Sequence, residues 1–406
     1  MNKYILSNGI RFIYDYRPGN ITSFCIGFEA GALMEEGFKL GTAHAVEHVI
    51  FKGTKNRSEY EINKLFDEIF GFNNAMTNYP YCIYYGTTLS SDFERGIELY
   101  SDIILNPKFS NEGFEEEINI ICEELKKWND DIEQYCEDRL FYNSFKKRRI
   151  KNLIIGDEKS IRCITLEDIK KFYESYYLPQ NCVISVVSSL NFDEVLKLLE
   201  KYFGEFKGNY NIYKDISLYE NNNPGIYVEN KNGISSAKVQ YIYPIHELNN
   251  EEIKILNIFN NILGQGTSSL LYDKIRTKNG LVYDIGSSIK NEKGIKLFTI
   301  KFSTSSDKIN DVIKLINQTI EESKCNKYYY SKKILDKNLK SINIKRELSI
   351  ERSIELSKKL TTYEIMYKDY DIFYKENDLE NITYKEIIDV INKVLKYPSI
   401  QIIKPY

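Results

Sequence analysis

Two of the three histidines in this chain of 406 residues, His44 and His48, lie four positions apart with Glu47 between them. Positions i and i+4 of a helix lie on one face, one turn apart, so two imidazoles at this spacing can bind one metal ion. The order H-x-x-E-H is the inverse of the metal-binding sequence H-E-x-x-H, in which the glutamate is a base and not a ligand. We interpret the histidines as metal ligands; the alternative is that they are ordinary residues of a helix face.

The residues around this pair predict a short helix. Thr42 can cap its start through its hydroxyl group. Gly53 follows the apolar run at 49–52 and is a typical C-terminal stop. A helix over these residues places both imidazoles on the same side.

A catalytic zinc ion usually has three protein ligands and one open position for water. The third histidine of the chain, His246, follows the run Y-P-I at 243–245 and is most simply interpreted as a loop or strand-end residue. A carboxylate is therefore the better candidate for the third ligand.

Residues 110–135 predict an amphipathic helix that is rich in glutamate. At about 100° per residue, Glu117 and Glu124 project with the apolar residues, whereas Glu116 and Glu123 project toward solvent. Burying a carboxylate without a partner is costly, so we expect Glu117 and Glu124 to face the metal. Because the helix is acidic overall, periodicity alone leaves open that both line the edge of a solvated face.

These segments resemble the pitrilysin family of metallopeptidases, which includes insulin-degrading enzyme and the mitochondrial processing peptidase. The motif H-A-V-E-H at 44–48 is followed by F-K-G-T at 51–54, as in that family. The opening strand of the family is similar to L-S-N-G-I-R at 6–11, and its N-A-x-T strand to N-A-M-T at 74–77. Residues 117–130 are similar to its second glutamate motif.

The resemblance implies that Zn²⁺ is bound by His44, His48 and Glu124. It implies that Glu117 orients a ligand from outside the coordination sphere. It also implies that Glu47 takes a proton from water and later delivers it to the leaving amine.

The resemblance extends to the second half of the chain, where residues 268–276 and 280–283 are similar to the family's arginine–tyrosine motif. It implies that Arg276 and Tyr283 help to hold the scissile carbonyl; without it, both are read as surface residues. It also implies edge-strand pairing with substrate at a strand that is otherwise an ordinary edge strand and contains Asn74, Ala75, Met76 and Thr77.

Three positions depart from the family pattern. Ala45 stands where relatives usually carry a larger apolar residue, and Pro80 stands where a glutamate is common. Ile118 stands where an arginine usually follows the first glutamate, so Glu117 is expected to lack that partner. None of these changes removes a ligand.

The composition bounds the class of protein. A hydrophobic fraction of 42% is enough for the cores of two domains, and a net charge of −3 predicts no strong attraction to nucleic acid or anionic membrane. Seven cysteines, an odd number without a C-x-x-C pair, favour reduced thiols. No signal-peptide core or bilayer-spanning apolar run occurs. We therefore expect a cytoplasmic protein without a membrane partner.

A similar pattern occurs twice in the chain. Residues 164–169 lead into a predicted helix and then a strand at 182–187, and residues 382–387 lead into a helix and then a strand at 400–403. This recurrence indicates two duplicated halves.

An asparagine- and glycine-rich stretch predicts a linker at 209–224. It separates an N-terminal catalytic zinc-binding domain, 1–208, from a homologous C-terminal domain, 225–406, that carries the arginine–tyrosine motif. The family resemblance implies an α+β fold of two similar domains, each an antiparallel sheet with helices packed on one face.

The predicted function is that of a zinc-dependent endopeptidase that hydrolyses unfolded peptides or a precursor peptide in an enclosed chamber. A homodimer is expected, with a heteromeric partner as the alternative. The rival hypothesis is a non-catalytic or partner-dependent subunit of a peptide-processing complex. A third is metal binding without hydrolysis, which the presence of Glu47 disfavours.

Overall fold

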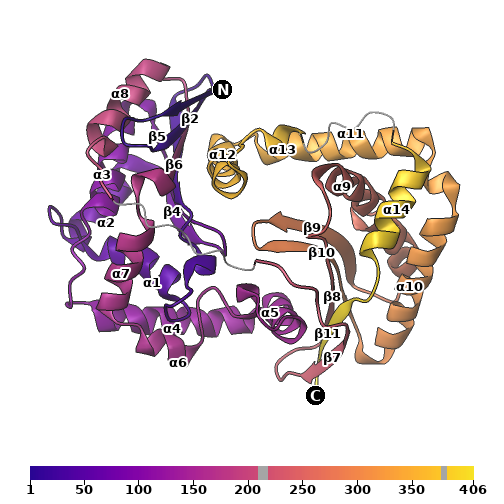
Figure 1. Cartoon of the computed structure of the whole chain (residues 1–406). Helices are drawn as coiled ribbons and strands as arrows, with labels where there is room; N and C mark the ends of the chain where they lie inside the picture. The colour runs from indigo at the N-terminus through magenta and orange to yellow at the C-terminus, as the bar shows by residue number, and fades with distance from the viewer. Residues whose placement is uncertain (209–217, 376–381) are drawn as a thin grey trace. The chain divides into compact units, whose positions relative to one another are not determined.

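The computed structural model describes residues 1–208, 218–375 and 382–406. The chain divides into two compact units (Figure 1). The first unit consists of Met1–Lys126, Asn152–Ile216 and Leu348–Phe373, and the second of Lys127–Lys151, Ser217–Glu347 and Tyr374–Tyr406. Each unit therefore includes one segment from the other half of the chain.

The first unit is built on a six-stranded sheet in the order β1-β2-β6-β3-β5-β4. Its strands are β1 (Asn2–Ile5), β2 (Arg11–Tyr16), β3 (Ile21–Phe28), β4 (Phe70–Thr77), β5 (Cys82–Leu89) and β6 (Cys182–Ser188). Neighbouring strands are antiparallel except β2 and β6, which are parallel. The strand β4 lies at one edge and pairs only with β5.

One face of this sheet is covered by amphipathic helices. In α8, for example, Val195, Leu199 and Phe203 recur every four residues and are buried, which is the spacing of one helix face. They share a core with Phe24 and Ile26 of β3. The helices are α1 (Thr42–Val49), α2 (Glu59–Ile69), α3 (Phe93–Leu105), α4 (Phe114–Asp130), α6 (Glu158–Cys163), α7 (Leu166–Tyr176) and α8 (Phe192–Phe203).

The opposite face of the sheet is covered by α12 (Ser353–Tyr367), which comes from the second half of the chain. Ser23 of β3 bonds Ser353 at 2.8 Å between hydroxyl oxygens. Gly27 lies so close to α12 that a Cβ there would be 2.6 Å from the Thr361 methyl carbon. The first half's own helices thus cover one face of its sheet, as predicted, and the other face is covered by a helix from the second half. This second layer accounts for the burial of β3 on both sides along nearly its whole length.

The second unit has a five-stranded sheet in the order β7-β11-β8-β10-β9. Its strands are β7 (Gly225–Asn230), β8 (Ala237–Pro244), β9 (Asp284–Glu292), β10 (Ile295–Thr304) and β11 (Ser399–Lys404). The pair β7 and β11 is parallel, and the other pairs are antiparallel. Each sheet is therefore antiparallel, as predicted, except for one parallel pair of strands.

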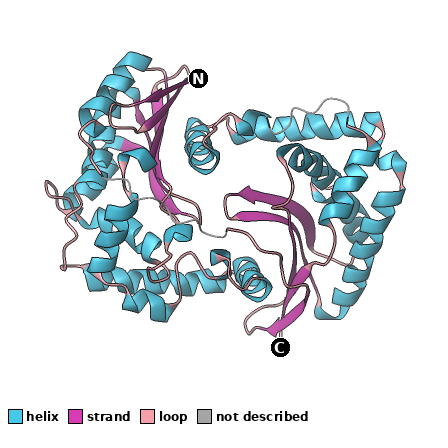
Figure 2. Cartoon of the chain, in the orientation of Figure 1, coloured by secondary structure: helices cyan, strands magenta, loops and turns pink. Residues whose placement is uncertain are grey.

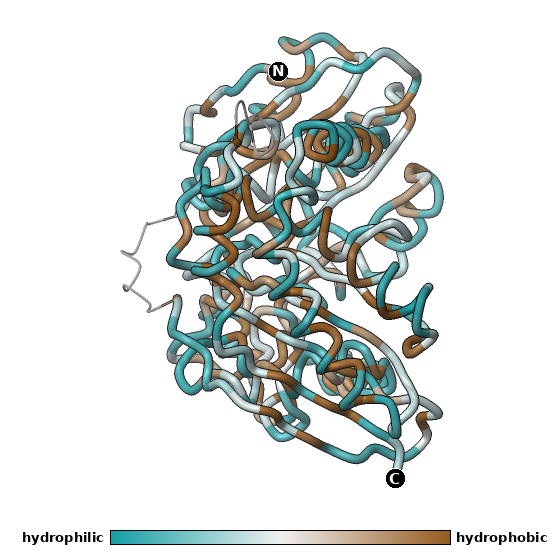
Figure 3. The backbone as a smooth tube through the Cα atoms, turned by 90° about the vertical axis from the view of Figure 1, so that its right-hand side faces the viewer, coloured by the Kyte–Doolittle hydropathy of each residue, from teal (hydrophilic) through white to brown (hydrophobic). Residues whose placement is uncertain are grey.

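Helices lie on both faces of the second sheet as well (Figure 2). One face packs against α9 (Asn250–Gly264), α10 (Ile309–Cys325) and α14 (Tyr384–Val394) through a common apolar core. The other face contacts α5 (Ile132–Ser144), where the Gln240 side chain donates to the Glu133 carbonyl at 3.0 Å. The remaining helices are α11 (Lys332–Ser349) and α13 (Ile372–Lys375). Figure 3 shows apolar and hydrophilic positions interspersed along the helices, as one buried face requires.

Short helical turns connect many of these elements. Turns of 3-10 helix lie at η1 (Ala32–Met34), η2 (Ile50–Lys52), η3 (Ser90–Asp92), η4 (Arg149–Lys151), η5 (Pro179–Asn181), η7 (Ser306–Lys308) and η8 (Lys327–Tyr330). A π-helical turn, η6, spans Tyr272–Thr277. Of these, η2 and η6 carry residues that matter for the candidate site.

The two units repeat one topology. The order β2-β6-β3-β5-β4 has the same connectivity as β7-β11-β8-β10-β9. The repeated sequence pattern corresponds to α7 with β6 and to α14 with β11, and a capping box opens each helix, at Thr165 with Asp168 and at Thr383 with Glu386. The predicted α+β fold with two similar domains is confirmed.

The domain boundaries at 208 and 225 stay predictions, and residues 209–217 of the predicted linker lie outside the described residues. The compact units differ from continuous domains because α5 and α12 each pack with the other half. Across the described ranges, no helix combines the length and apolarity needed to cross a membrane.

Candidate metal centre

The helix α1 begins at a glycine that is held against a neighbouring loop. Gly41 has a φ of +91°, and a Cβ at this position would lie 2.3 Å from the Ile155 carbonyl oxygen. The buried Glu35 carboxylate accepts hydrogen bonds from the backbone N–H of Gly41 at 3.1 Å and of Ala43 at 2.9 Å. The predicted Thr42 cap is thus wrong: Glu35 takes that role and places a negative charge at the positive end of the helix.

The C-terminal end of α1 is fixed by a buried carboxylate. The helix continues into η2 and stops at Gly53, which has a φ of +131°, as predicted. The next residues are held by Asp102, which accepts hydrogen bonds from Thr54 at 2.7 Å, Asn56 at 2.6 Å and Arg57 at 2.7 Å. Both ends of the helix are therefore anchored.

Three side chains converge where the sequence predicted a metal. One possible ligand atom from each of His44, His48 and Glu124 lies within 4.8 Å of the other two, and no other such group occurs within 1–208, 218–375 and 382–406. Oε2 of Glu124 lies 3.7 Å from Nε2 of His44 and 3.4 Å from Nε2 of His48. Ligands at zinc bond lengths on a tetrahedron are about 3.4 Å apart. The donor set and its spacing fit a zinc ion with one open position.

Glu117 contacts His48 on the side away from Glu124, and Lys52 contacts Glu117. Nδ1 of His48 lies 2.8 Å from Oε1 of Glu117, which leaves Nε2 toward the other two ligands. Lys52 lies 3.2 Å from the second Glu117 oxygen and 2.9 Å from Glu59. Ile118, at the position where an arginine was expected to be missing, is buried in the core, and the cation beside Glu117 is Lys52.

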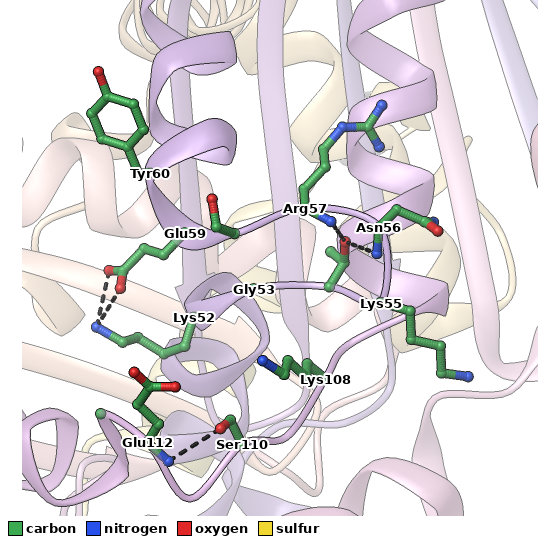
Figure 4. A pocket seen from close by; sticks show the side chains of 13 residues that line it. Lys52, Gly53, Lys55, Asn56, Arg57, Glu59, Tyr60, Lys108, Ser110 and Glu112 are labelled. Carbon is green, nitrogen blue, oxygen red and sulfur yellow. Dashed lines mark hydrogen bonds and ion pairs between the residues drawn. The ribbon is translucent and has the colours of Figure 1, made fainter.

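A surface hollow of about 720 Å³ lies beside these contacts (Figure 4). Its walls come from the loop after α1 and from the segment that precedes α4. Figure 4 shows Lys52 directed toward Glu59 within the hollow. Lys52, which contacts Glu117, is therefore reachable from the surface.

The electrostatics of the group differ from residue to residue. Burial, reinforced by the neighbouring His48, lowers the pKa of His44 to about 4. Burial would also lower the pKa of His48, but hydrogen bonds with Glu117 and Glu124 outweigh it and raise that pKa to about 9. Burial raises the pKa of Glu47 to about 7, although a hydrogen bond from Thr77 opposes the shift.

The four residues predicted to bind substrate lie on the edge strand. Asn74, Ala75, Met76 and Thr77 form the end of β4. The N–H of Asn78, next in the chain, donates toward the β5 side to the Tyr81 carbonyl. Because N–H groups alternate along a strand, that of Ala75 faces the free edge. There it donates to the Asn74 side chain at 2.8 Å.

The predicted arginine and tyrosine lie in the second unit. Arg276 is exposed on η6, with its guanidinium 4.8 Å from the Tyr272 ring centre. Tyr283 precedes β9 and is 64% exposed. His246 follows β8 and stacks on Tyr219 with 5.3 Å between ring centres. It is not part of the metal-binding group, in line with its interpretation as a strand-end residue.

Sequence reasoning missed two residues of this site. Lys52 lies four positions after His48, so the helical spacing that linked His44 to His48 could have found it. Glu35 gave no signal, because its carboxylate reaches the helix start from six residues away.

Comparisons with known proteins identify the family of this chain. A family profile described as Insulinase (Peptidase family M16) matches residues 11–158, and one described as Peptidase M16 inactive domain matches residues 164–339. An uncharacterized zinc protease of Bacillus subtilis is 26% identical over 79% of this chain and 78% of its own length. An uncharacterized zinc protease of Rickettsia felis is 26% identical over 96% of this chain and 93% of its own length. The mitochondrial-processing peptidase subunit beta of Saccharomyces cerevisiae is 29% identical over 49% of this chain and 43% of its own length.

Solved structures share the fold along the whole chain. A protease from Helicobacter pylori superposes with a TM-score of 0.87 at 23% identity, covering 100% of this chain and 99% of its own. A peptidase M16 inactive domain from Pseudomonas fluorescens gives 0.88 at 16% identity, covering 100% and 98%. With its H-x-x-E-H helix and distal glutamate, this chain belongs to the insulinase family, peptidase family M16.

Proposed function

We propose that this chain is a zinc-dependent endopeptidase that hydrolyses unfolded peptides. The observation that carries the proposal is the convergence of His44, His48 and Glu124 on one point, with Glu47 on the same helix. Two imidazoles and one carboxylate are the ligand set of catalytic zinc sites that keep an open position for water. A site used only for metal storage has no need of a base beside it.

The roles of the side chains follow from their environment. When bound, Zn²⁺ supplies Lewis acidity that polarises the peptide carbonyl and lowers the pKa of water. Glu47 takes the water proton and returns it to the leaving amine, and its pKa of about 7 suits transfer in both directions near neutral pH. Glu117 holds His48 in the tautomer that presents Nε2 to the metal.

The free edge of β4 is the proposed substrate-binding surface. An extended peptide that adds to this edge is recognised mainly through its backbone, so many sequences are accepted. Substrate pairing at Ala75 must displace the Asn74 side chain, which occupies that backbone N–H in the structure. An unfolded chain presents an extended segment at any point of its sequence, so the proposed substrates are unfolded peptides or precursor segments.

Arg276 and Tyr283 are proposed to stabilise the developing oxyanion from the second unit. Both side chains are exposed, so neither is consumed by a role in the core. The proposal includes an enclosed chamber for the reaction and a homodimer as the assembled form.

A partner-dependent subunit is the second candidate. Two observations favour it: residues 164–339 match a profile described as inactive, and the yeast relative is named as a subunit. Against it, this chain carries the complete metal-binding group together with Glu47.

Peptide cleavage by the purified chain tests the proposal. A mixed library of unstructured peptides is incubated with zinc and wild type, Glu47→Gln or Glu123→Gln, and products are read by mass spectrometry. We expect cleavage by wild type and by Glu123→Gln, whose exposed carboxylate pairs with Lys126, and none by Glu47→Gln. Cleavage by Glu47→Gln at the wild-type rate would refute the assignment of the base. Zinc binding without cleavage in any variant favours the partner-dependent subunit.

A further inference from the structure

The proposed base, Glu47, is hydrogen-bonded to β4, the strand that is proposed to bind substrate. The hydroxyl of Thr77, the last residue of β4, donates to Oε2 of Glu47 across 2.5 Å. A hydroxyl has one proton to donate, and the Glu47 oxygen is the nearer of its two acceptors, at 2.5 Å against 3.5 Å for Sγ of Cys82. Resting on the proposed function, we propose that Thr77 is a positioning residue that holds the Glu47 carboxylate for proton transfer.

A buried polar chain fixes Thr77 in turn. Thr77 pairs with Cys82 in the β4–β5 register, and Sγ of Cys82 lies 3.5 Å from the Thr77 hydroxyl. The same sulfur lies 3.2 Å from the Tyr84 hydroxyl, which lies 2.7 Å from that of Tyr177. Cys82 and Tyr84 are fully buried and Tyr177 is 2% exposed. The inner part of this chain, from Cys82 to Tyr177, thus lies in the core of the first unit, and Glu47 and Thr77 are half-buried at its outer end.

The far end of this chain is rigid. The Tyr177 ring stacks on Phe28 of β3 with 4.6 Å between ring centres. A threonine side chain is itself stiff at χ1 because it is branched at Cβ. Glu47, by contrast, has three rotatable side-chain bonds, so its carboxylate depends on an external contact for a defined direction. Thr77 supplies that contact from a fixed strand.

This arrangement links substrate register to the position of the base. Ala75 and Thr77 are alternate residues of β4, and the N–H of Ala75 points to the free edge where a peptide would pair. The hydroxyl two residues further on holds Glu47. The strand β4 would therefore fix both the position of a bound peptide and the position of the Glu47 carboxylate that activates water. Misplacing a catalytic group by about 1 Å can lower turnover about 100-fold.

The test compares Thr77→Val, which keeps the shape and removes the hydroxyl, with Thr77→Ser, which keeps the hydroxyl. Thr87→Val is the matched control, because Thr87 lies further along β5 and its hydroxyl bonds Ser23 at 2.8 Å. We expect Thr77→Val to lower kcat about 10- to 100-fold with KM within about twofold. Thr77→Ser restores kcat to within about threefold of wild type, and Thr87→Val leaves it unchanged. Bound zinc, measured by mass spectrometry, is the same in all variants.

Crystal structures of the zinc-loaded variants give a readout that does not depend on cleavage. We expect the Glu47 carboxylate to be displaced in Thr77→Val and retained in Thr77→Ser. A Thr77→Val enzyme with wild-type kcat, or with Glu47 unmoved, overturns the positioning role. If wild type cleaves no peptide while Glu47 still moves only in Thr77→Val, the proposed function fails and the positioning role stands.

Discussion

Nδ1 of His48 lies 2.8 Å from Oε1 of Glu117, and this contact decides which ring nitrogen of His48 faces the metal position. Nε2 is left 3.4 Å from Glu124. Since a metal ligand must be a neutral imidazole at its bonding nitrogen, the carboxylate behind the ring selects the correct tautomer. Glu117 is therefore proposed to act on the metal through His48 and not as a ligand.

Zinc uptake by the metal-free protein is expected to release a proton. The pKa of His48, about 9, lies above its ordinary value of 6.5, so His48 keeps its proton at neutral pH and zinc must displace it. The apparent affinity therefore rises by up to about tenfold per pH unit and levels off once the pH passes about 9. Calorimetric titration in buffers of different ionisation enthalpy counts the released protons. Zinc affinity that does not change with pH would contradict this assignment.

Removal of the positive charge behind Glu117 is expected to weaken zinc binding. Lys52→Met takes away the cation that lies 3.2 Å from Glu117, so the carboxylate holds His48 less firmly. We expect zinc affinity to fall about tenfold, measured by competition with a chelator. Lys108→Met is the control, because Lys108 is an exposed lysine of the same hollow. Equal losses in both variants would point to a general effect of surface charge.

The third ligand can be separated from its neighbour in the chain. Glu124→Gln removes a carboxylate from the metal-binding group and should lower zinc affinity more than 100-fold. Loss of a residue that only contacts a ligand typically lowers metal affinity about 10- to 100-fold. Glu123→Gln should leave it unchanged, because that side chain is 66% exposed and pairs with Lys126. Metal content after dialysis distinguishes the two. A zinc-free Glu123→Gln protein would place the ligand one residue earlier.

Arg276→Ala and Tyr283→Phe are expected to lower kcat without loss of stability. Tyr283 is 64% exposed and Arg276 is exposed beside the Tyr272 ring, so melting temperatures should match wild type. If these groups hold the oxyanion, each change should lower kcat about 100-fold. Tyr328→Phe, at a 71% exposed tyrosine of the same unit, is the control. Wild-type turnover in both variants would mean that the first unit performs the chemistry alone.

Helical periodicity placed the two glutamates of α4 on the correct side but could not assign their roles. In the structure Glu117 is 7% exposed and the Glu124 side chain is 41% exposed. Both helical angles fit an inward side, and Glu117 is the more buried because it contacts His48 and Lys52. Such contacts are tertiary, so the family resemblance supplied the role of Glu124, which is a proposal that zinc binding tests.

Long-range contacts account for what the sequence did not reveal. The helix α12 packs on the first sheet partly through small hydroxyl residues such as Ser353 and Thr361, and these interrupt the apolar pattern that periodicity detects. The Glu35 cap of α1 is a contact of the same kind, since local rules favour the nearest hydroxyl at Thr42. By contrast, Gly53 and the two capping boxes depend on neighbouring residues and were readable from them.

The reciprocal placement of α5 and α12 has a consequence for how the chain can be divided. Each half contributes one helix to the sheet of the other half, so a separate half lacks the helix that covers one face of its own sheet. A fragment that ends before residue 209 would leave the Ser23 and Gly27 face of its sheet bare, and its own α5 would have no sheet to cover. Two such fragments made separately should each expose an apolar surface and aggregate. Made together, they should recover a folded protein whose nicked chain comes apart only when both units unfold.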